Sequence, residues 1–271
     1  MFAKIRHIAM YTDKLNPVSN FYHTIFGMKR MTTGTVDETG QQNAGRGHIS
    51  DGVIGLAVLP RYAGIQSGID HYGFEVADAK EAVRRIEEHY PGIMVAKALE
   101  HVPFAGLRSH DISGAQFDIA QQGMNNIREG YTQEGWDQPR WINHIAIRTY
   151  EPWKLAEFYE KVFDLKKVAG FGEGGSVCLT DGKVKLLLRP CDNSLYRGLR
   201  EGIDHIGFKV ENLEQAKKDL KDIAESAPDS APRKLAVGKH GHMIEEDFQR
   251  CCLGQHFISD PDGVLIDISE N

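Results

Sequence analysis

GIDHIGF, at residues 202–208, decides the fold of this chain because it is present twice. The other copy is GIDHYGF, at residues 68–74. Each copy alternates large apolar residues with small or polar ones, a pattern typical of a half-buried strand. In the later copy Ile206 and Phe208 point to one face of the strand and His205 points to the other. A histidine on the non-aliphatic face at two equivalent places is the first indication of a site.

Three further landmarks repeat in the same order in both halves of the chain. They are a strand with a histidine followed by a helix with a Phe-Tyr pair, an Asp-Gly turn before an apolar strand, and a closing strand that ends in Asp. Their positions are 4–28 and 141–165, 51–52 and 181–182, and 111–118 and 260–267. Together with the heptapeptide, these landmarks indicate two tandem domains.

A fainter repeat divides each half again. His7 and His71 each lie on a strand that leads into a helix and then into turn-separated strands, so each half holds two strand–helix–three-strand units. A helix covers one sheet face of such a unit, and two bare faces are expected to meet. We therefore expect an α+β fold of two domains, each of two paired βαβββ units forming a curled mixed sheet around a cleft. The expected domains are residues 1–122 and 140–271, joined by a polar linker over 123–139.

Composition and charge exclude several classes of protein. The 271 residues are 41% hydrophobic and 26% charged, as in ordinary soluble proteins. The net charge of -6 without a basic block argues against nucleic-acid binding. No run approaches the roughly 18 apolar residues that span a bilayer. Uncovered strand edges leave room for a homo-oligomer.

The cysteines and the N-terminus bear on the expected location. None of the four cysteines has CxxC spacing, and none lies in the first expected domain, so a disulfide framework is not expected. The chain runs from Met1 directly into an alternating strand, which leaves no room for a signal peptide. A cytoplasmic location is the expectation.

The polar residues expected to face the clefts form two matched sets, each of two histidines and one aspartate. The sets are His7, His71 and Asp118, and His144, His205 and Asp267. Two imidazoles and a carboxylate can bind a divalent metal ion, and three protein ligands leave positions open for water, substrate or oxygen. A single strand histidine is more often a packing residue, but the repetition of all three positions favours at least one metal site. Whether both sets bind metal is left open.

The aspartates fall into two kinds. Asp118 and Asp267 lie within apolar strands, where an unpaired carboxylate would be costly. Asp111 and Asp260 stand in turns, and we expect them to be turn formers rather than ligands.

These motifs resemble those of the vicinal oxygen chelate superfamily, which contains glyoxalases, extradiol dioxygenases, epimerases and bleomycin-type resistance proteins. The resemblance covers nearly all of both halves and is greatest to the two-domain type I extradiol dioxygenases. It implies that the C-terminal domain holds the iron, here through His144, His205 and Asp267. The sequence departs from the family in having Asp where Glu is usual. Phe257 and Arg108 also stand where the family motif has Tyr.

The family's acid–base histidine has no counterpart in residues 186–201, so proton transfer would need other residues. His242 and His256 are expected near the second set, and His101 near the first. Each could equally be a loop or packing histidine. Arg108 could pair with a substrate carboxylate, or lie in solvent at a strand end. Cys251 and Cys252 are assigned no role.

The resemblance implies a metal-dependent enzyme acting on a small organic molecule that chelates the metal through neighbouring oxygens. An Fe(II) dioxygenase is the first expectation, because two histidines and a carboxylate suit that ion. A glyoxalase- or isomerase-like reaction with Zn, Mn or Ni would need no oxygen. A non-catalytic binding protein of the resistance type is the third alternative.

Overall fold

The computed structural model describes residues 2–31, 48–97, 104–123, 138–171, 175–192 and 199–271. The elements of the first half are β1 (Ala3–Thr12), α1 (Leu15–Phe26), β2 (Lys29–Arg30), β3 (His48–Ser50), β4 (Gly55–Pro60), β5 (Gly68–Val76), α2 (Ala79–His89), β6 (Ala96–Lys97), β7 (Leu107–His110) and β8 (Gln116–Gln121). Those of the second half are β9 (Trp141–Thr149), α4 (Pro152–Phe163), β10 (Lys166–Lys167), β11 (Val177–Thr180), β12 (Lys185–Pro190), β13 (Gly202–Lys209), α5 (Leu213–Ser226), the 3₁₀ helix η1 (Pro228–Ser230), α6 (Gly238–Phe248), β14 (His256–Ser259) and β15 (Leu265–Ser269). Among the described residues, no helix is long and apolar enough to cross a membrane.

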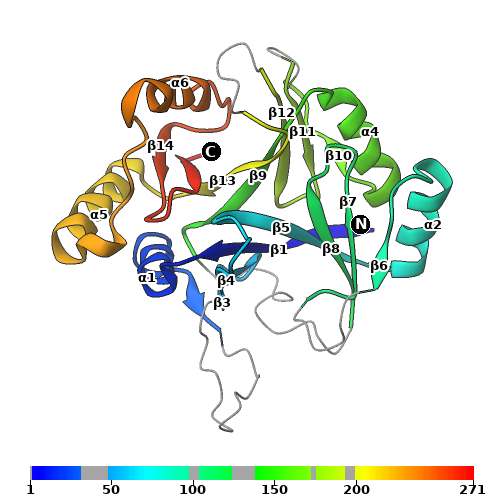
Figure 1. The fold of residues 1–271 in the computed structure, drawn as a ribbon, viewed down its shortest axis with the longest axis horizontal. Helices are drawn as coiled ribbons and strands as arrows, with labels where there is room; N and C mark the ends of the chain where they lie inside the picture. Colours follow the sequence, from blue (N-terminus) through cyan, green and yellow to red (C-terminus); the bar gives the residue numbers. More distant parts are fainter. Residues whose placement is uncertain (1, 32–47, 98–103, 124–137, 172–174, 193–198) are drawn as a thin grey trace, which may run out of the picture. The chain divides into compact units, whose positions relative to one another are not determined.

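Each half forms one open, mixed sheet (Figure 1). The strand orders are β2-β3-β4-β1-β5-β8-β7-β6 and β10-β11-β12-β9-β13-β15-β14. The first half thus consists of two βαβββ units, which confirms the expected α+β fold. The fourth unit differs, because within the described residues α6 stands where the other three units have a short edge strand. The domain boundaries stay a prediction, since residues 124–137 of the expected linker lie outside the described residues.

The sheet register places each closing aspartate beside a strand of the repeated heptapeptide. β5 pairs with β8 in parallel, with Gly73 opposite Asp118, and β13 pairs with β15 in the same way. On the other side of β8, antiparallel β7 places Arg108 opposite Asp118. Paired residues share a face, so His71, Gly73 and Asp118 all lie on one face of the first sheet.

The chain packs as two compact units that each combine parts of both halves. The first unit comprises residues 1–7, 71–129 and 143–204, and the second comprises residues 8–70, 130–142 and 205–271. Each unit therefore contains a βαβββ unit from either half. The packing of a βαβββ unit of one half with a unit of the other half was not predicted from the sequence.

In the first unit, aromatic residues of α4 pack on the strands of the first half. The rings of Phe163 and Phe74 stack with their centroids 4.0 Å apart, and both side chains are fully buried. The hydroxyl of Tyr159 donates to the Asp111 carboxylate and contacts the hydroxyl of Tyr72. Such stacked, hydrogen-bonded aromatics contribute both buried area and geometric specificity.

The second unit repeats this packing with the halves reversed. Phe26 of α1 stacks on Phe208 at a centroid distance of 3.6 Å, and the Tyr22 hydroxyl donates to Asp260 Oδ2 at 3.2 Å. The tyrosine of each Phe-Tyr pair therefore joins the first helix of one half to the closing turn of the other. Asp111 and Asp260 are turn residues, as expected. Asp260 Oδ1, for example, accepts the N–H groups of the next turn residues, 262 to 264.

The repeated Asp-Gly turns also form hydrogen bonds between the two halves of the sequence. Asp181 Oδ2 accepts the backbone N–H of Ile5 at 2.7 Å in the first unit. Asp51 Oδ2 accepts that of Ile142 at the same distance in the second unit. Each Asp-Gly turn thus accepts a hydrogen bond from an N–H group in the opening strand of the other half. Buried N–H groups need such a partner.

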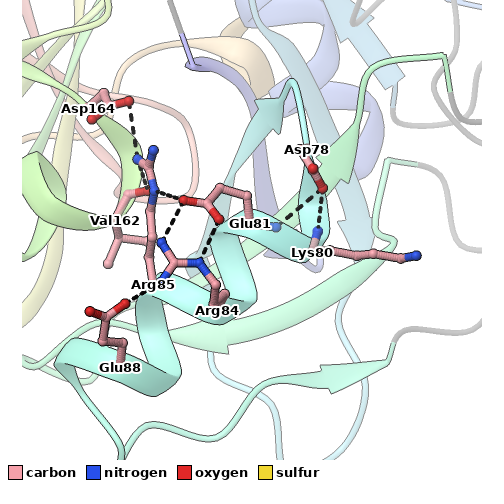
Figure 2. A network of polar contacts seen from close by, with 8 residues as sticks. All are labelled: Asp78, Lys80, Glu81, Arg84, Arg85, Glu88, Val162 and Asp164. Atoms are coloured by element: carbon pink, nitrogen blue, oxygen red, sulfur yellow. Dashed lines mark hydrogen bonds and ion pairs between the residues drawn. The ribbon is translucent and has the colours of Figure 1, made fainter.

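A polar network fastens α2 to the end of α4 in the first unit (Figure 2). Asp78 caps α2 by accepting the N–H groups of Lys80 and Glu81. Arg85 Nε lies 2.8 Å from Glu81 Oε1, and Arg85 Nη1 lies 3.1 Å from Asp164 Oδ2. Nη1 also donates to the Val162 carbonyl. A cation at the last turn of α4 is favoured by the helix dipole.

Asp260 predicts a pH dependence of stability. Burial raises the pKa of Asp260 to about 6, against the backbone donors that favour the charged form. Because the folded protein binds this proton more tightly than the unfolded chain, the free energy of unfolding falls as the pH rises from about 4 to about 6, by about 3 kcal/mol. Asp260→Asn keeps the Oδ1 acceptor and removes the titration. The unfolding free energy, measured with urea at pH 4 and at pH 7, should therefore fall by about 3 kcal/mol less in this variant than in wild type. An equal fall in both proteins would contradict this origin.

Candidate metal centres

Three side chains of the first unit, His7, His71 and Asp118, lie close together and form the first group. The Nε2 atoms of His7 and His71 are 3.2 Å apart, and Nε2 of His71 lies 3.1 Å from Oδ2 of Asp118. They come from β1, β5 and β8, and all three side chains are buried. One ligand atom from each lies within 4.8 Å of the other two.

These distances fit a shared divalent ion. Ligand atoms about 2.1 Å from one ion lie about 3.0–3.4 Å apart when the angle at the ion is about 90–110°. The observed separations of 3.1 and 3.2 Å fall within that range. Asp118 Oδ2 also reaches Nε2 of His71 directly, although Asp is shorter than the Glu usual at this position in the resembled family.

Arg108 sets the charge of this group. Its Nε donates to Oδ1 of Asp118 at 2.7 Å and its Nη2 donates to Oδ2 at 3.1 Å. Burial alone would raise the pKa of Asp118, but the hydrogen bonds from His71 and Arg108 outweigh it and hold that pKa well below its ordinary value. Asp118 is therefore a carboxylate at neutral pH, ready to bind a cation. The Arg108 side chain is 40% exposed, so it forms the solvent edge of the group.

Phe104 forms an apolar wall beside the first group. Its ring stacks on the ring of His7 at a centroid distance of 5.0 Å. This approach requires Gly73 of the repeated heptapeptide, because a Cβ there would lie 2.6 Å from the Phe104 ring and 3.1 Å from Cβ of His7. Phe104 also has a φ of 70°, which residues other than glycine rarely adopt. The surroundings thus fix the orientation of the His7 ring.

The second set contains a residue that the sequence analysis missed. In the second unit, His205 Nε2 lies 3.3 Å from Oδ2 of Asp267. Cys251, in the loop between α6 and β14, places its Sγ 3.1 Å from that oxygen and 3.5 Å from that nitrogen. His144 is fully buried on β9 in the first unit, with Nδ1 2.8 Å from Oδ1 of Asn143.

A sequence signal for Cys251 existed, although it was weak. Cys251 lies six residues before Phe257, the residue that pairs with Asp267 across β14 and β15. It also lies in the part of the fourth unit that has no counterpart elsewhere in the repeat. A ligand-type residue in an unmatched segment close to a predicted ligand could have been taken as a candidate.

The other predicted residues lie in different surroundings. His242 is on α6, largely exposed, with Nδ1 4.0 Å from a Glu245 oxygen. His256 pairs with Ile268, and so points to the face of β14 opposite that of Phe257 and Asp267. Burial lowers the His256 pKa. His101 lies outside the described residues. Of the four residues considered for proton transfer or substrate contact, the described structure brings Arg108 to a metal group.

A separate cavity of about 540 Å³ lies under α2 in the first unit. Its lining includes Val83, Leu107 and Ile119. Leu107 and Ile119 alternate with Arg108 and Asp118 along β7 and β8, so the cavity is on the opposite face of the sheet. It belongs to the helix-covered side rather than to the metal group.

Comparison with known proteins agrees with the division of the chain into two repeated halves. The family model described as "Glyoxalase/Bleomycin resistance protein/Dioxygenase superfamily" matches residues 4–137 and 141–268. A search of curated proteins found no match.

Several solved structures share the fold. A Mn(II)-bound glyoxalase from Novosphingobium aromaticivorans superposes with a TM-score of 0.62 at 12% identity, covering 99% of this chain and 82% of the other. A mutant 4-hydroxymandelate synthase from Streptomyces coelicolor gives 0.60 at 14% identity, with 99% and 92% covered. Homoprotocatechuate 2,3-dioxygenase from Brevibacterium fuscum gives 0.59 at 14% identity, with 98% and 79% covered. At these identities the likeness concerns the fold alone.

Proposed function

Because this chain belongs to the Glyoxalase/Bleomycin resistance protein/Dioxygenase superfamily, we propose that it is a metal-dependent enzyme whose working site is His7, His71 and Asp118. The observation that carries the proposal is the convergence of two Nε2 atoms and one carboxylate oxygen at separations of 3.1 and 3.2 Å. The proposed site lies in the first half, whereas the resemblance to type I extradiol dioxygenases pointed to the second.

The charge of the first group supports a substrate with anionic oxygens. Asp118 contributes one negative charge, so a divalent ion there leaves a charge of about +1, and Arg108 raises it to about +2. A buried positive charge is stabilised by anionic partners. A small organic molecule with neighbouring oxygens, at least one of them ionised, would supply such a partner.

Each residue of the first group has a defined task in this proposal. His7 and His71 would present their Nε2 atoms to the ion, and the Phe104 ring stacked on His7 holds that imidazole in place. Asp118 supplies the charged ligand, and Arg108 orients it through Oδ1. Its Nη2 stays on Oδ2 of Asp118, and the exposed edge of the guanidinium can contact a substrate oxygen.

Among the reactions of this superfamily, we favour an Fe(II)-dependent, extradiol-like dioxygenase reaction. Two histidines and one carboxylate with open positions are the ligand set of non-haem Fe(II) oxygenases. A bound divalent ion would polarise the substrate oxygens and, as Fe(II), would also bind oxygen. The likeness to a Mn(II)-bound glyoxalase supports a second candidate, an oxygen-independent lyase or isomerase reaction on another divalent metal.

The test is metal analysis combined with oxygen uptake. The protein would be loaded anaerobically with Fe(II), desalted, and supplied with catechols and 2-hydroxy acids in an oxygen electrode. We expect Fe(II) to bind at the first group and oxygen consumption that depends on both substrate and iron. His7→Ala and His71→Ala should remove both.

The alternatives give different results in the same experiment. Turnover with Mn(II) or Ni(II) in the absence of oxygen would replace the dioxygenase by the lyase or isomerase reaction. Tight substrate binding without turnover would indicate a binding protein. Full metal binding and activity in His71→Ala would contradict the proposed site itself.

A further inference from the structure

We infer that Arg108 makes metal binding at the first group depend on an anionic ligand, so that the ion and the substrate each bind more tightly in the presence of the other. This coupling rests on the proposed function, because it concerns the same site. It adds a regulation of that site which the three metal ligands alone do not provide.

The guanidinium of Arg108 and a bound ion would share one carboxylate. Nη2 of Arg108 donates to Oδ2 of Asp118 at 3.1 Å, and the same Oδ2 lies 3.1 Å from Nε2 of His71. Nη2 also lies 3.4 Å from that Nε2. An ion about 2.1 Å from Oδ2 would therefore lie at most about 5.2 Å from Nη2. Two positive charges at that separation repel each other.

The protein ligands do not balance these charges. Asp118 is the one carboxylate of the first group, so a divalent ion and Arg108 together exceed its charge by two. The Asp118 side chain is 1% exposed, so the solvent does little to screen the excess. The ion alone would still bind, but less tightly than it would without Arg108. An anionic ligand would remove part of the excess charge and so retain the ion.

Arg108 lies where an anion from the solvent can reach it. Its side chain is 40% exposed, whereas that of His71 is 5% exposed. A small molecule with neighbouring oxygens could contact the exposed edge of the guanidinium and present its oxygens to the ion. One anion would then offset both cations, so the binding of the ion and the binding of the anion are coupled. Such coupling is reciprocal, because each ligand changes the affinity of the other by the same factor.

The second half has the same position without a charge. β7 places Arg108 opposite Asp118, whereas β14 places Phe257 opposite Asp267. The repeated fold therefore does not require an arginine to position the aspartate of a closing strand. An effect on ligand binding explains why a cation stands next to a metal ligand in the first half. The competing explanation is that Arg108 only orients Asp118, in which case its loss would weaken metal binding instead of strengthening it.

The test is Mn²⁺ titration followed by the electron paramagnetic resonance signal of the free ion. Each protein would be compared with the same protein carrying His71→Ala, so that the difference reports binding at the first group. Lactate is the anionic probe, because its carboxylate has a neighbouring hydroxyl group, and lactamide is its neutral counterpart. In wild type we expect saturating lactate to tighten Mn²⁺ binding by about 10-fold or more, within the range typical of coupled sites. Lactamide should have no such effect.

Three variants separate the charge of Arg108 from its hydrogen bonds. Without lactate, Arg108→Gln should bind Mn²⁺ about 10-fold more tightly than wild type, and lactate should tighten that binding by at most about threefold. Arg108→Lys keeps the charge but loses the fork, so it should resemble wild type. Arg84→Gln is the matched control, because it removes an arginine of α2 in the same unit that is 59% exposed. It should change neither the Mn²⁺ affinity nor the effect of lactate.

Melting temperatures provide a second measurement, because a ligand that binds only the folded protein raises its stability. Mn²⁺ should raise the melting temperature of Arg108→Gln more than that of wild type. Weaker or unchanged Mn²⁺ binding in Arg108→Gln, or an equal effect of lactate in this variant and in wild type, would overturn the inference. So would an Arg108→Lys variant that behaves like Arg108→Gln.

Oxygen uptake reports separately on the proposed function. Coupling of Mn²⁺ and lactate without any oxygen uptake would leave the role of Arg108 in place and remove the dioxygenase reaction. Oxygen uptake that depends on His71 but shows no coupling would do the reverse. Absence of His71-dependent Mn²⁺ binding from every variant would overturn both.

Discussion

Asp118→Asn is expected to abolish metal-dependent turnover, with a loss of at least about 10³-fold in kcat/KM. Asn has the size of Asp but carries no charge, so the first group would keep two neutral imidazoles and the positive Arg108 and would repel a cation. A bound metal contributes several kcal/mol of transition-state stabilisation, and each 1.36 kcal/mol corresponds to a factor of ten in rate. The measurement is metal content after anaerobic loading, followed by substrate kinetics.

The matched control is Asp267→Asn at the equivalent position of the second half. If the reaction takes place at the first group, this variant should keep kcat/KM within about threefold of wild type while it remains folded. The opposite pattern, with activity lost in Asp267→Asn and kept in Asp118→Asn, would return the working site to the second half. The two variants therefore decide which of the duplicated groups carries the reaction.

The histidine–aspartate pairs of both groups were predictable from the sequence. Strand alternation assigns His71 and His205 to the non-aliphatic face, and the repeat assigns Asp118 and Asp267 the same place in each closing strand. Since a slip of one residue would move every side chain to the other face, a repeated pattern fixes register as well as face. The structure accordingly places His71 3.1 Å from Asp118 and His205 3.3 Å from Asp267.

The place of Cys251 beside His205 and Asp267 was not predictable from these patterns. It lies in a loop after α6, and α6 has no counterpart in the other three units, so the repeat offers no template for its position. Periodicity says which face of a strand a residue occupies, but it does not say where a loop returns to the sheet. The same limit applies to His256, whose face became known only from the pairing of β14 with β15.

The fold was predictable at the level of βαβββ units, but the exchange of packing between the halves was not. The Phe-Tyr pairs were recognised as repeat markers, yet nothing local says that Tyr159 meets Asp111 or that Tyr22 meets Asp260. An amphipathic helix specifies that an apolar face must be buried and leaves its partner undefined. In each compact unit that partner comes from the other half of the sequence.

Phe163→Ala is expected to destabilise the protein by about 3–5 kcal/mol, the usual cost of removing a fully buried phenylalanine. Phe163 belongs to the second half, but its ring stacks on Phe74 of β5 in the first. The cavity should therefore loosen strands of the first half. Hydrogen exchange followed by mass spectrometry should show faster exchange in β5 and β8 as well as in α4.

Phe26→Ala provides the reciprocal control. Phe26 belongs to the first half and stacks on Phe208 of β13 in the second, so its removal should raise exchange in β13 and β15 at a similar cost in stability. If instead each variant loosened only the strands of its own half, the halves would fold as independent domains and the exchanged packing would contribute little. Crossed effects in both variants would mean that neither half completes its core alone, because each needs the first helix of the other.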